Sequence, residues 1–402
     1  MNSNNSPRPL DGITVIEVGQ LLAGPWAGTM LAYFGAEVIK VEPPGEGDPI
    51  RGWRILDETG TAYWWRSLAR NKKSVTANLR TDDGREVVRR LMNSADVVIE
   101  NFKPGTMEKW GLGPDDLATE NPDLIFARIS GYGQTGPNAT KPGYASVTEA
   151  YSGFRYVNGF PGEVPVRPNL SIGDTISGIH AFMGILLALL ERGQNRDTGG
   201  QVVDVALYEA MYNLMEGMVP EYSGGGEIRE PSGSTITGIV PTNTYLCGDG
   251  KHVVIGANGD SIFTRLMNAM DKPEIAADGR YATNAGRVEH QDFIDGSIAI
   301  WTKARPADEV ISLLEAAEVP VGPIYNVADM MADPHFRARG LFEEVTVNGA
   351  TMEIPAISPK LSATPGKTDW PGGELGSHTD EILQRTGFTP AEIDALRAKG
   401  AV

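Results

Sequence analysis

The fold class is decided by residues 12–42, which read Gly12-Ile-Thr-Val-Ile-Glu-Val-Gly-Gln-Leu-Leu-Ala-Gly-Pro-Trp-Ala-Gly-Thr-Met-Leu-Ala-Tyr-Phe-Gly-Ala-Glu-Val-Ile-Lys-Val-Glu42. Short runs at 12–18 and 37–42 are rich in Val and Ile and predict two strands. Residues 19–25 form a turn with Gly and Pro, and 27–35 predict a helix. A strand, a helix and a strand at this spacing predict a βαβ unit.

The same alternation continues along the first half of the chain. Further strands are predicted at 74–79, 96–100, 124–130 and 201–207, and helices at 84–94, 114–119 and 208–219. This series predicts an α/β fold with a parallel sheet covered on both faces. Ligands of such sheets bind at the carboxyl ends of the strands, which here are residues 19–25, 42–48, 101–105 and 131–136.

Composition changes at residues 223–238, where Gly, Ser and Thr are frequent. We interpret this stretch as a domain boundary that contains a mobile loop. A hairpin at 244–246 and 252–255, with helices at 261–270, 291–302 and 307–317, predicts a smaller α+β unit. The domains are therefore predicted at 1–222, 223–328 and 329–402. The last of them ends in a helix over 379–399 and completes the large domain.

Composition excludes several classes of protein. The 402 residues include 35 Lys and Arg against 52 Asp and Glu, and the net charge of −17 argues against nucleic acid as a partner. The single cysteine, Cys247, excludes an intramolecular disulfide and a Cys-clustered zinc site, and we expect no metal. The longest apolar run, 181–190, falls short of the ~18–20 residues of a membrane span, and residues 1–9 lack a signal core. We expect a cytoplasmic protein without a membrane partner.

Positive charge is nevertheless concentrated in one part of the chain. Lys103 and Lys109 follow closely on a basic zone made of Arg51, Arg54, Arg66, Arg70, Lys72, Lys73 and Arg80. A small polyanionic ligand and a solvated, ion-paired surface both explain such a zone, and charge alone leaves both open.

One loop imitates a dinucleotide fingerprint. Gly131-Tyr-Gly-Gln-Thr-Gly136 matches the Gly-x-Gly-x-x-Gly spacing after a predicted strand. The fingerprint requires a helix to open within it, but Pro137, Pro142 and Gly143 follow and predict a loop. We do not expect a nicotinamide cofactor.

A long apolar helix is predicted after Arg167-Pro-Asn-Leu-Ser-Ile-Gly-Asp174. It has almost no polar face as far as residue 190, so we expect burial on most sides. Asp174 lies where this helix begins. It is either an ordinary N-cap that accepts bonds from the first N–H groups, or a carboxylate at the wall of a site that acts as a nucleophile.

Short motifs follow one another along almost the whole chain. They are Leu10-Asp-Gly-Ile13, Ala23-Gly-Pro25, Gly35-Ala-Glu-Val-Ile-Lys-Val-Glu42, Gly47-Asp48, Arg51, Asn71-Lys72, Glu100-Asn-Phe-Lys-Pro-Gly105, Ser130-Gly-Tyr-Gly133, Gly173-Asp174, Gly200-Gln201 and Leu375-Gly-Ser-His-Thr379. This ordered set resembles the class III CoA-transferases, the formyl-CoA:oxalate and carnitine CoA-transferase family, which also contains an acyl-CoA racemase branch.

The resemblance implies that Asp174 is the nucleophile. Its attack on a thioester gives a mixed anhydride and CoA thiolate, and then an enzyme-bound thioester that a second acid captures. CoA thioesters are then substrates, with no permanently bound cofactor. The family's CoA contacts correspond to Leu22, Ala23, Ala77, Asn78, Arg80, Asn101, Phe102, Lys103, Lys109, Tyr144 and Ala145. The cations among them would meet the phosphates of CoA.

Two positions depart from the family pattern. Pro43 stands where some members carry an Arg near the adenosine moiety, and Ala145 stands where many carry an acidic residue. The neighbouring Tyr144 either donates a hydrogen bond or packs. A racemase needs two opposed acid/base groups, and the resemblance implies that the racemase branch supplies a His in the loop 141–146. This loop has no His, which favours a transferase over a racemase. An acyl-CoA thioesterase remains an alternative if water reaches the anhydride.

The acid substrate is less clearly marked. Gly238-Ile-Val-Pro241 and Pro165-Val-Arg-Pro168 resemble the branch that moves CoA from succinyl-CoA to dicarboxylic acids. Arg167 or Arg155 would then neutralise the distal carboxylate, although either can equally be a structural ion pair.

The resemblance also implies an assembly. Family members combine a large Rossmann-like domain with a smaller domain, and two chains thread through each other as interlocked rings. We therefore expect a homodimer whose other partners are a small acyl-CoA and a carboxylic acid. A Gly-containing loop at the domain junction covers the nucleophile in the family, which predicts a lid at 223–238, although a plain interdomain linker fits the composition equally well.

Overall fold

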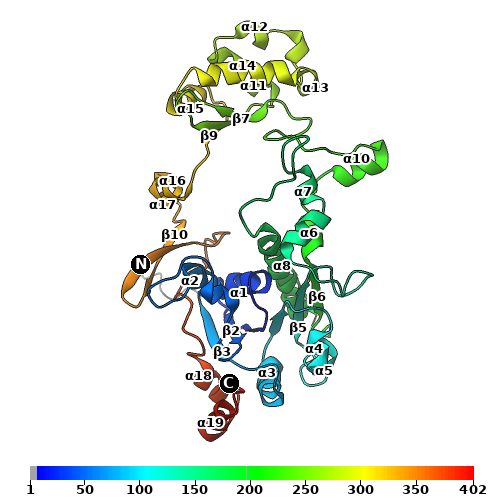
Figure 1. Cartoon of the computed structure of the whole chain (residues 1–402), viewed down its shortest axis with the longest axis vertical. Helices are drawn as coiled ribbons and strands as arrows, with labels where there is room; N and C mark the ends of the chain where they lie inside the picture. The colour runs from blue at the N-terminus through cyan, green and yellow to red at the C-terminus, as the bar shows by residue number, and fades with distance from the viewer. Residues whose placement is uncertain (1–6, 196) are drawn as a thin grey trace. The chain divides into compact units, whose positions relative to one another are not determined.

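The structure, a computed structural model, describes residues 7–195 and 197–402 and forms two compact units (Figure 1). The first unit consists of the chain up to Phe154 together with Pro168–Glu216 and Phe336–Val402. The second consists of Arg155–Arg167 and Gly217–His335. The chain therefore leaves the first unit at residue 216 and returns at 336, where composition had suggested 222 and 329. Residues 155–167 also belong to the second unit.

A six-stranded parallel sheet forms the centre of the first unit. Its order is β3-β2-β1-β4-β5-β6, with bounds Thr14–Glu17 (β1), Glu37–Glu42 (β2), Lys72–Thr76 (β3), Val97–Glu100 (β4), Ile125–Ser130 (β5) and Val202–Ala206 (β6). All neighbouring pairs are parallel, so the predicted α/β fold is confirmed. The chain builds outward from β1 to one edge and then returns beside β1 with β4. The strand order reverses there, and open parallel sheets bind their ligands at such a point.

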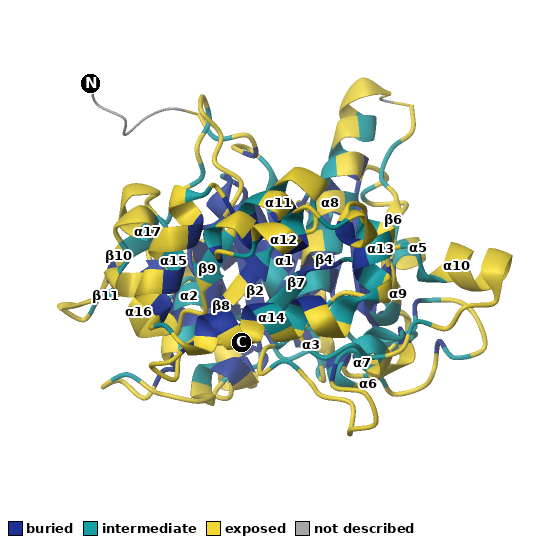
Figure 2. Cartoon of the chain, turned by 90° about the horizontal axis from the view of Figure 1, so that it is seen from above, coloured by how far each residue is buried: buried dark blue, intermediate teal, exposed yellow. Residues whose placement is uncertain are grey.

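Alternate residues of the strands enter two separate cores, as the two-residue period of a strand requires. Val15, Val38 and Val97 face the core built with α1 (Ala23–Tyr33) and α8 (Ile172–Gln194). Ile16 and Ile39 face the opposite core. That core is closed by α3 (Asp82–Asn93), α18 (Thr379–Arg385) and α19 (Pro390–Ala398). Strands β1, β2, β4 and β5 are thus buried on both faces (Figure 2), whereas the edge strand β6 begins with exposed residues.

Helix α8 differs from the expectation in its burial. It packs on α1, β5 and β6, but Ile179, Met183, Leu187 and Leu190 form an exposed apolar stripe along its outer side. The prediction of burial on most sides is therefore wrong for the single chain. By length and composition alone α8 is one helix that could cross a membrane, with 23 residues and a mean hydropathy of 1.6. The apolar run at 181–190, on which the sequence-based prediction of no membrane span rested, covers only part of this helix.

Two predicted helices are interrupted. The helix expected over 379–399 is α18 and α19, because Gly387 turns the chain at φ 92° and Thr389 caps the second helix with Glu392. The helix expected over 208–219 is α9 (Leu207–Tyr212) and α10 (Met218–Gly225), with Glu216 at φ 48° between them. Helix α10 therefore includes the first residues of the stretch predicted to be a mobile loop.

The remaining elements of the first unit are short. A hairpin that the sequence did not predict is formed by β10 (Phe342–Val347) and β11 (Ala350–Pro355). The short helices are α2 (Tyr63–Leu68), α4 (Thr106–Lys109), α5 (Pro114–Leu117), α6 (Ala145–Tyr151) and α17 (Pro334–Ala338), the last beginning in the second unit.

The second unit has its own core. The predicted hairpin is confirmed as β7 (Thr242–Leu246) and β8 (His252–Gly256), and β9 (Val321–Pro323) adds a third antiparallel strand. Its helices are α10, α11 (Asp260–Ala269), α12 (Pro273–Ala276), α13 (Asn284–Glu289), α14 (Gln291–Lys303), α15 (Ala307–Ala316) and α16 (Val327–Ala332), while α7 (Phe154–Val157) spans the boundary. Arg287 is fully buried in this core and donates to the carbonyls of Val240, Tyr281 and Asn258.

Candidate active site

Asp174 lines a cavity of about 350 Å³ at the carboxyl ends of β1, β4 and β5, which we call the nucleophile cavity. Among its lining residues Asp174 is the one carboxylate, and Lys103 and Lys141 are the two cations. The lining residues are Gln20, Leu21, Ala23, Asn101, Phe102, Lys103, Pro104, Ile129, Ser130, Gly131, Lys141, Pro142, Gly143, Tyr144, Asp174 and Leu207. The predicted nucleophile therefore lies at the strand ends where a parallel sheet binds its ligands.

A second cavity of about 320 Å³, the distal cavity, lies at the ends of β1, β2 and β3. Phe102 and Trp110 meet edge to face in its wall, with ring centroids 5.2 Å apart. Gln20 and Phe102 line both cavities, so the two are neighbours along one edge of the sheet. The distal cavity is lined by Val18, Gln20, Val41, Glu42, Pro43, Pro44, Glu46, Gly47, Pro49, Ala77, Asn78, Leu79, Arg80, Phe102 and Trp110.

Most of the predicted CoA contacts meet at these two cavities. Ala23, Asn101, Phe102, Lys103 and Tyr144 line the nucleophile cavity, and Ala77, Asn78 and Arg80 line the distal one. Three do not. Leu22 is buried and lines a separate apolar cavity of about 620 Å³, Ala145 is buried, and Lys109 is exposed on α4 outside both cavities.

Asp174 is not the N-cap of α8. The helix begins at Ile172 with Ser171 as its N-cap, so the interpretation of Asp174 as the N-cap residue is wrong. Asp174 is the third helical residue, where the positive end of the helix dipole stabilises a carboxylate. A neighbour that the sequence did not reveal is Glu149 on α6. It is fully buried, and its Oε1 accepts from the N–H of Gly173 at 3.3 Å.

Glu149 lies one helical turn after Ala145, the position at which many family members carry an acidic residue. The i, i+4 spacing places both on one side of α6 and is the signal that would have drawn attention to Glu149. A second carboxylate is thus close to the nucleophile's helix start, although it comes from a different position.

The loop after β4 is fixed by a buried ion pair. Arg128 on β5 donates to Glu100 at 2.8 Å and to Glu108 at 2.6 Å, while the other oxygen of Glu100 accepts from the N–H of Phe102 at 2.7 Å. Burial raises the pKa of Glu100, and the bonds from Arg128 and Phe102 oppose this rise. These contacts hold the backbone that carries Asn101, Phe102 and Lys103 into the cavities.

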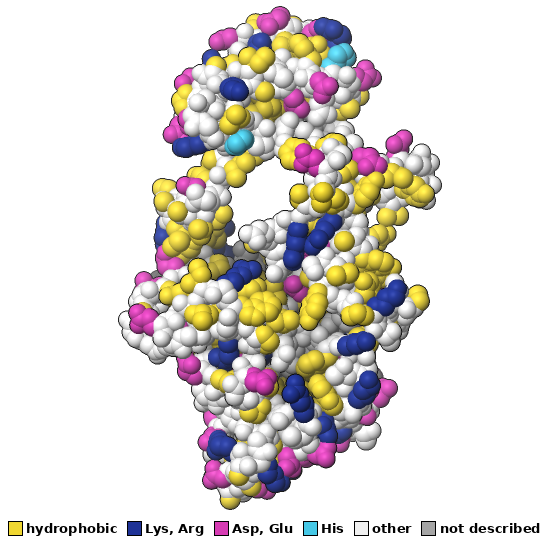
Figure 3. Space-filling view, viewed as in Figure 1, with side chains coloured by type: hydrophobic (Ala, Val, Ile, Leu, Met, Phe, Trp, Pro, Cys, Tyr) yellow, Lys and Arg dark blue, Asp and Glu magenta, His cyan; other side chains and the backbone are white. Residues whose placement is uncertain are grey.

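Most cations of the predicted basic zone form ion pairs with carboxylates of this chain. Arg51 binds Glu42, Arg66 binds Asp57, and Lys72 binds Glu17, each at 2.7–2.9 Å. Arg70 and Lys73 are likewise paired, with Glu343 and with Glu37 and Glu381. Accordingly, Lys and Arg side chains are scattered over the face shown in Figure 3. Of the cations predicted to meet CoA, Arg80 and Lys103 are exposed at the cavities, and no ion pair is observed for either among the described residues.

The described residues that line the nucleophile cavity do not include the His that the racemase alternative would use. The loop before α6 brings Lys141, Pro142 and Tyr144 to the nucleophile cavity but no His. His180 on α8 is half-buried and lines neither cavity, and its ring bonds the carbonyl of Ile176 at 2.9 Å and Asn213 at 3.3 Å. Among residues 7–195 and 197–402, no group of three or more His, Cys, Asp or Glu is arranged to hold a metal ion.

Arg155 and Arg167 belong to the second unit, whereas both cavities belong to the first. The same holds for the segment 238–241 that resembles the dicarboxylate branch. A role of either Arg in binding the acid therefore stays a prediction.

Comparison with known proteins adds a family to this geometry. The family model described as CoA-transferase family III matches residues 10–379. The succinyl-CoA–D-citramalate CoA-transferase of Chloroflexus aurantiacus is 47% identical, with 100% of each chain covered. The alpha subunit of succinyl-CoA–L-malate CoA-transferase from the same organism is 41% identical, over 97% of this chain and 92% of that one.

Solved structures agree with the fold. A CAIB/BAIF family protein from Brucella suis superposes with a TM-score of 0.84 at 35% identity, over 94% of this chain and 100% of that one.

Proposed function

This chain belongs to CoA-transferase family III and is a CoA-transferase, and from that premise we propose that it moves CoA from succinyl-CoA to a short dicarboxylic acid. The two relatives described above are named for succinyl-CoA as donor and for D-citramalate or L-malate as acceptor. We take the donor and the class of acceptor from them.

The proposed reaction proceeds in four acyl exchanges on Asp174. Its carboxylate attacks the succinyl thioester, and CoA thiolate leaves, giving a mixed anhydride. The thiolate attacks the aspartyl carbonyl and releases succinate, giving an aspartyl-CoA thioester. The acceptor carboxylate displaces the thiolate to form a second anhydride. The thiolate then attacks the acceptor's carbonyl and frees Asp174. No net proton is consumed, and each step exchanges similarly activated acyl groups.

One observation carries this proposal. Asp174 is the carboxylate of the nucleophile cavity, in the first turn of α8, beside the residues that match the family's CoA contacts. N–H groups of that turn can stabilise the oxyanion that forms at each exchange. Lys103 and Lys141 supply positive charge for substrates that carry several negative charges.

We further propose that the distal cavity receives the adenosine end of CoA. Its apolar and aromatic wall includes Phe102 and Trp110, and its rim carries the exposed Arg80. Pro43 lines the same cavity. The contact that some family members make with an Arg at that position would then come from Arg80.

Asp174→Ala and Asp174→Asn test this function. We expect each to lower transfer from succinyl-CoA to D-citramalate or L-malate by roughly a thousandfold or more, because Asp174 is the one carboxylate among the residues that line the nucleophile cavity. Circular dichroism and the melting temperature should stay near those of the unchanged protein. The control is Asp96→Asn, since Asp96 is at the opposite end of the sheet, bonded to Thr14 and Arg192.

Asp96→Asn should lose some stability but keep the rate of transfer. Near-normal transfer by Asp174→Ala would refute the mechanism. Exchange of the substrate's α-proton with deuterated water in place of transfer would indicate a racemase. Release of CoA without an acceptor acid would indicate a thioesterase.

We also propose that the chain forms an interlocked homodimer in the cytoplasm. The support is the family resemblance together with the exposed apolar stripe on α8, since exposed apolar strips of this kind commonly mark protein interfaces.

A further inference from the structure

The loop after β1 forms a wall of both cavities. Gln20 and Leu21 line the nucleophile cavity, and Gln20 also lines the distal one. Leu21 has φ 65°, a left-handed conformation that residues other than glycine rarely adopt. Such conformations persist only where surrounding contacts enforce them, and they cluster at functional sites. The loop is therefore held in shape from outside.

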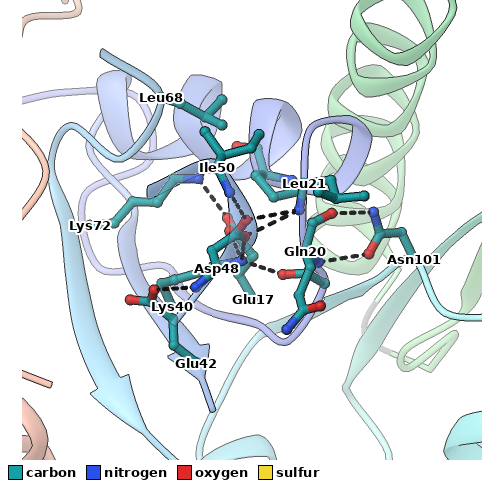
Figure 4. Close-up of polar contacts among 12 residues, drawn as sticks. Glu17, Gln20, Leu21, Lys40, Glu42, Asp48, Ile50, Leu68, Lys72 and Asn101 are labelled. Atoms are coloured by element: carbon teal, nitrogen blue, oxygen red, sulfur yellow. Dashed lines mark hydrogen bonds and ion pairs between the residues drawn. The ribbon is translucent and has the colours of Figure 1, made fainter. Parts of the chain in front are cut away.

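Its backbone bonds go to side chains from other elements. The Asn101 amide receives a bond from the N–H of Gln20 at 2.8 Å and donates one to its carbonyl at 2.7 Å. The N–H of Leu21 donates to both oxygens of Asp48, at 3.1 and 3.2 Å. The ammonium of Lys40 donates to the carbonyl of Gly19. Three successive residues of the wall are thus fixed by three side chains (Figure 4).

Behind the loop lies a buried charge network formed by Glu17, Lys40, Asp48 and Lys72. Lys40 lies 2.9 Å from Asp48 and 3.2 Å from Glu17, and Lys72 lies 2.8 Å from the other oxygen of Glu17. Each of the four side chains is at most 2% exposed. Two carboxylates balance two ammonium groups, which is how buried charges are tolerated.

The network keeps Lys40 charged although the residue is completely buried. Burial disfavours the ammonium, but Asp48, Glu17 and Glu42 outweigh it and raise its pKa. A buried network is costly compared with an apolar core of the same volume. This one directs an ammonium and a carboxylate at the backbone of the cavity wall, which an apolar core could not do.

We propose that Asp48 and Lys40 are positioning residues for the transferase reaction. They hold the wall at residues 19–21 so that an acyl-CoA lying against it presents its thioester carbonyl to Asp174. The inference rests on the proposed function, and it gives a role to Asp48 and Lys40, two motif residues without one so far. Asp48 and Lys40 touch no substrate and act only through the backbone of the loop.

Asp48→Asn is the direct test. An amide can still accept from Leu21 but loses the attraction of Lys40, so the wall should become mobile. We expect kcat to fall by about 10–100-fold, the usual cost of misplacing a reacting group by about 1 Å, with KM for succinyl-CoA changed far less. Hydrogen exchange of the peptide containing residues 19–22 should become about tenfold faster or more.

The matched control is Asp57→Asn. Asp57 is a carboxylate that pairs with the buried Arg66 and accepts N–H bonds from Thr59 and Thr61, and it lines neither cavity. This variant should lose comparable stability while keeping kcat within about twofold and leaving exchange at 19–22 unchanged. If both variants lose kcat in proportion to stability, the network is only structural and the inference is overturned.

A double variant keeps the test decisive if Asp48→Asn folds poorly. Lys40→Met together with Asp48→Asn removes one charge of each sign and leaves Glu17 paired with Lys72. We expect it to recover stability but to remain deficient in kcat, because the bond from Lys40 to the carbonyl of Gly19 is lost and an amide binds the N–H of Leu21 more weakly than a carboxylate does. Recovery of both stability and kcat in the double variant would overturn the inference. An unchanged protein that transfers no CoA at all would instead overturn the proposed function.

Discussion

At the scale of the residue, single glycines decide how closely charged side chains approach the helices. A Cβ at Gly28, in α1, would lie 1.9 Å from Oε2 of Glu17. A Cβ at Gly24, in the same helix, would make an ordinary contact of 3.4 Å with Ile99. The first glycine is therefore required by the buried charge network, whereas the second is not.

Substitution of these two glycines tests that difference. Gly28→Ala should destabilise the protein by about 2 kcal/mol or more, because Glu17 must move away from Lys72 or the helix must shift. Gly24→Ala should be neutral, or stabilising by up to about 1 kcal/mol, because Ala favours a helix. Urea unfolding of the two variants measures both values. An equal loss of unfolding free energy in both variants would mean that contact with Glu17 does not determine how closely α1 packs on the sheet.

Arg80 and Lys103 allow a prediction about CoA. Each is exposed at a cavity, so Arg80→Ala or Lys103→Ala should raise KM for succinyl-CoA by roughly threefold to tenfold, as expected of solvent-screened contacts with phosphate. The variant that loses the 3′-phosphate contact should also discriminate less against dephospho-CoA. Lys399→Ala removes an exposed cation paired with Asp83 and is the control. Unchanged KM in both test variants would place the phosphates elsewhere.

At the scale of the element, the sequence was informative where local pattern and tertiary structure agree. Runs of Val and Ile located β1, β2 and β4, because a strand buried on both faces is apolar throughout. The position of β3 was predicted less well: the expected strand at 74–79 overlaps only the end of Lys72–Thr76, which begins with two lysines. The hairpin of β10 and β11 was overlooked although Asn348-Gly349 is a strong turn signal, and both residues have positive φ. Two predicted helices are interrupted at Glu216 and at Gly387, each a residue with positive φ. A helical pattern of apolar residues does not reveal such a single interruption.

The candidate site was predictable only in part. Asp174 and most of the residues predicted to contact CoA were named from motifs, and the structure brings them to the two cavities. Their roles stay predictions. The roles of Lys72, Arg66 and Arg70 could not, since a local count of charges does not show that carboxylates from distant segments neutralise them. The positioning roles of Lys40 and Asp48 were similarly hidden, because they depend on bonds to the turn at residues 19–21 that form only in the folded chain.

The segment 232–238 belongs to this scale as well. It is more firmly held than its composition suggests, because Asn284 donates to the carbonyl of Gly238 at 2.8 Å and accepts from Val240 at 3.1 Å. Gly233 has φ 69°, and a Cβ there would meet Phe160 at 2.8 Å, whereas Gly238 has φ 78° and open space around it.

If 223–238 is a lid, its glycines should affect the ratio of hydrolysis to transfer. Gly238→Ala strains only the backbone, and we expect lower turnover with more hydrolysis of succinyl-CoA per transfer, because a misplaced lid admits water to the anhydride. Gly233→Ala adds a clash and should act more strongly. Gly279→Ala, at an open position of the second unit, is the control. An unchanged ratio in both lid variants would mean that the segment is a linker.

At the scale of the whole molecule, the exposed apolar stripe of α8 predicts association. Light scattering should give twice the mass of one chain, independent of dilution over the micromolar range. Tagged and untagged dimers should not exchange subunits under native conditions, since interlocked rings must unfold to separate, and they should exchange after unfolding and refolding. A monomer would contradict the proposed assembly, and rapid native exchange would contradict the interlocking.

The central claim is that Asp174 itself carries the acyl group, and oxygen-18 tests it most directly. When the acceptor acid is labelled in its carboxylates, the acceptor oxygen that bridges the second anhydride remains on Asp174 after CoA attacks the acceptor's carbonyl. In a single turnover with excess enzyme, digestion and mass spectrometry should then find one oxygen-18 in the peptide containing Asp174 and none in the peptide containing Glu149. Transfer without label in Asp174 would contradict the account.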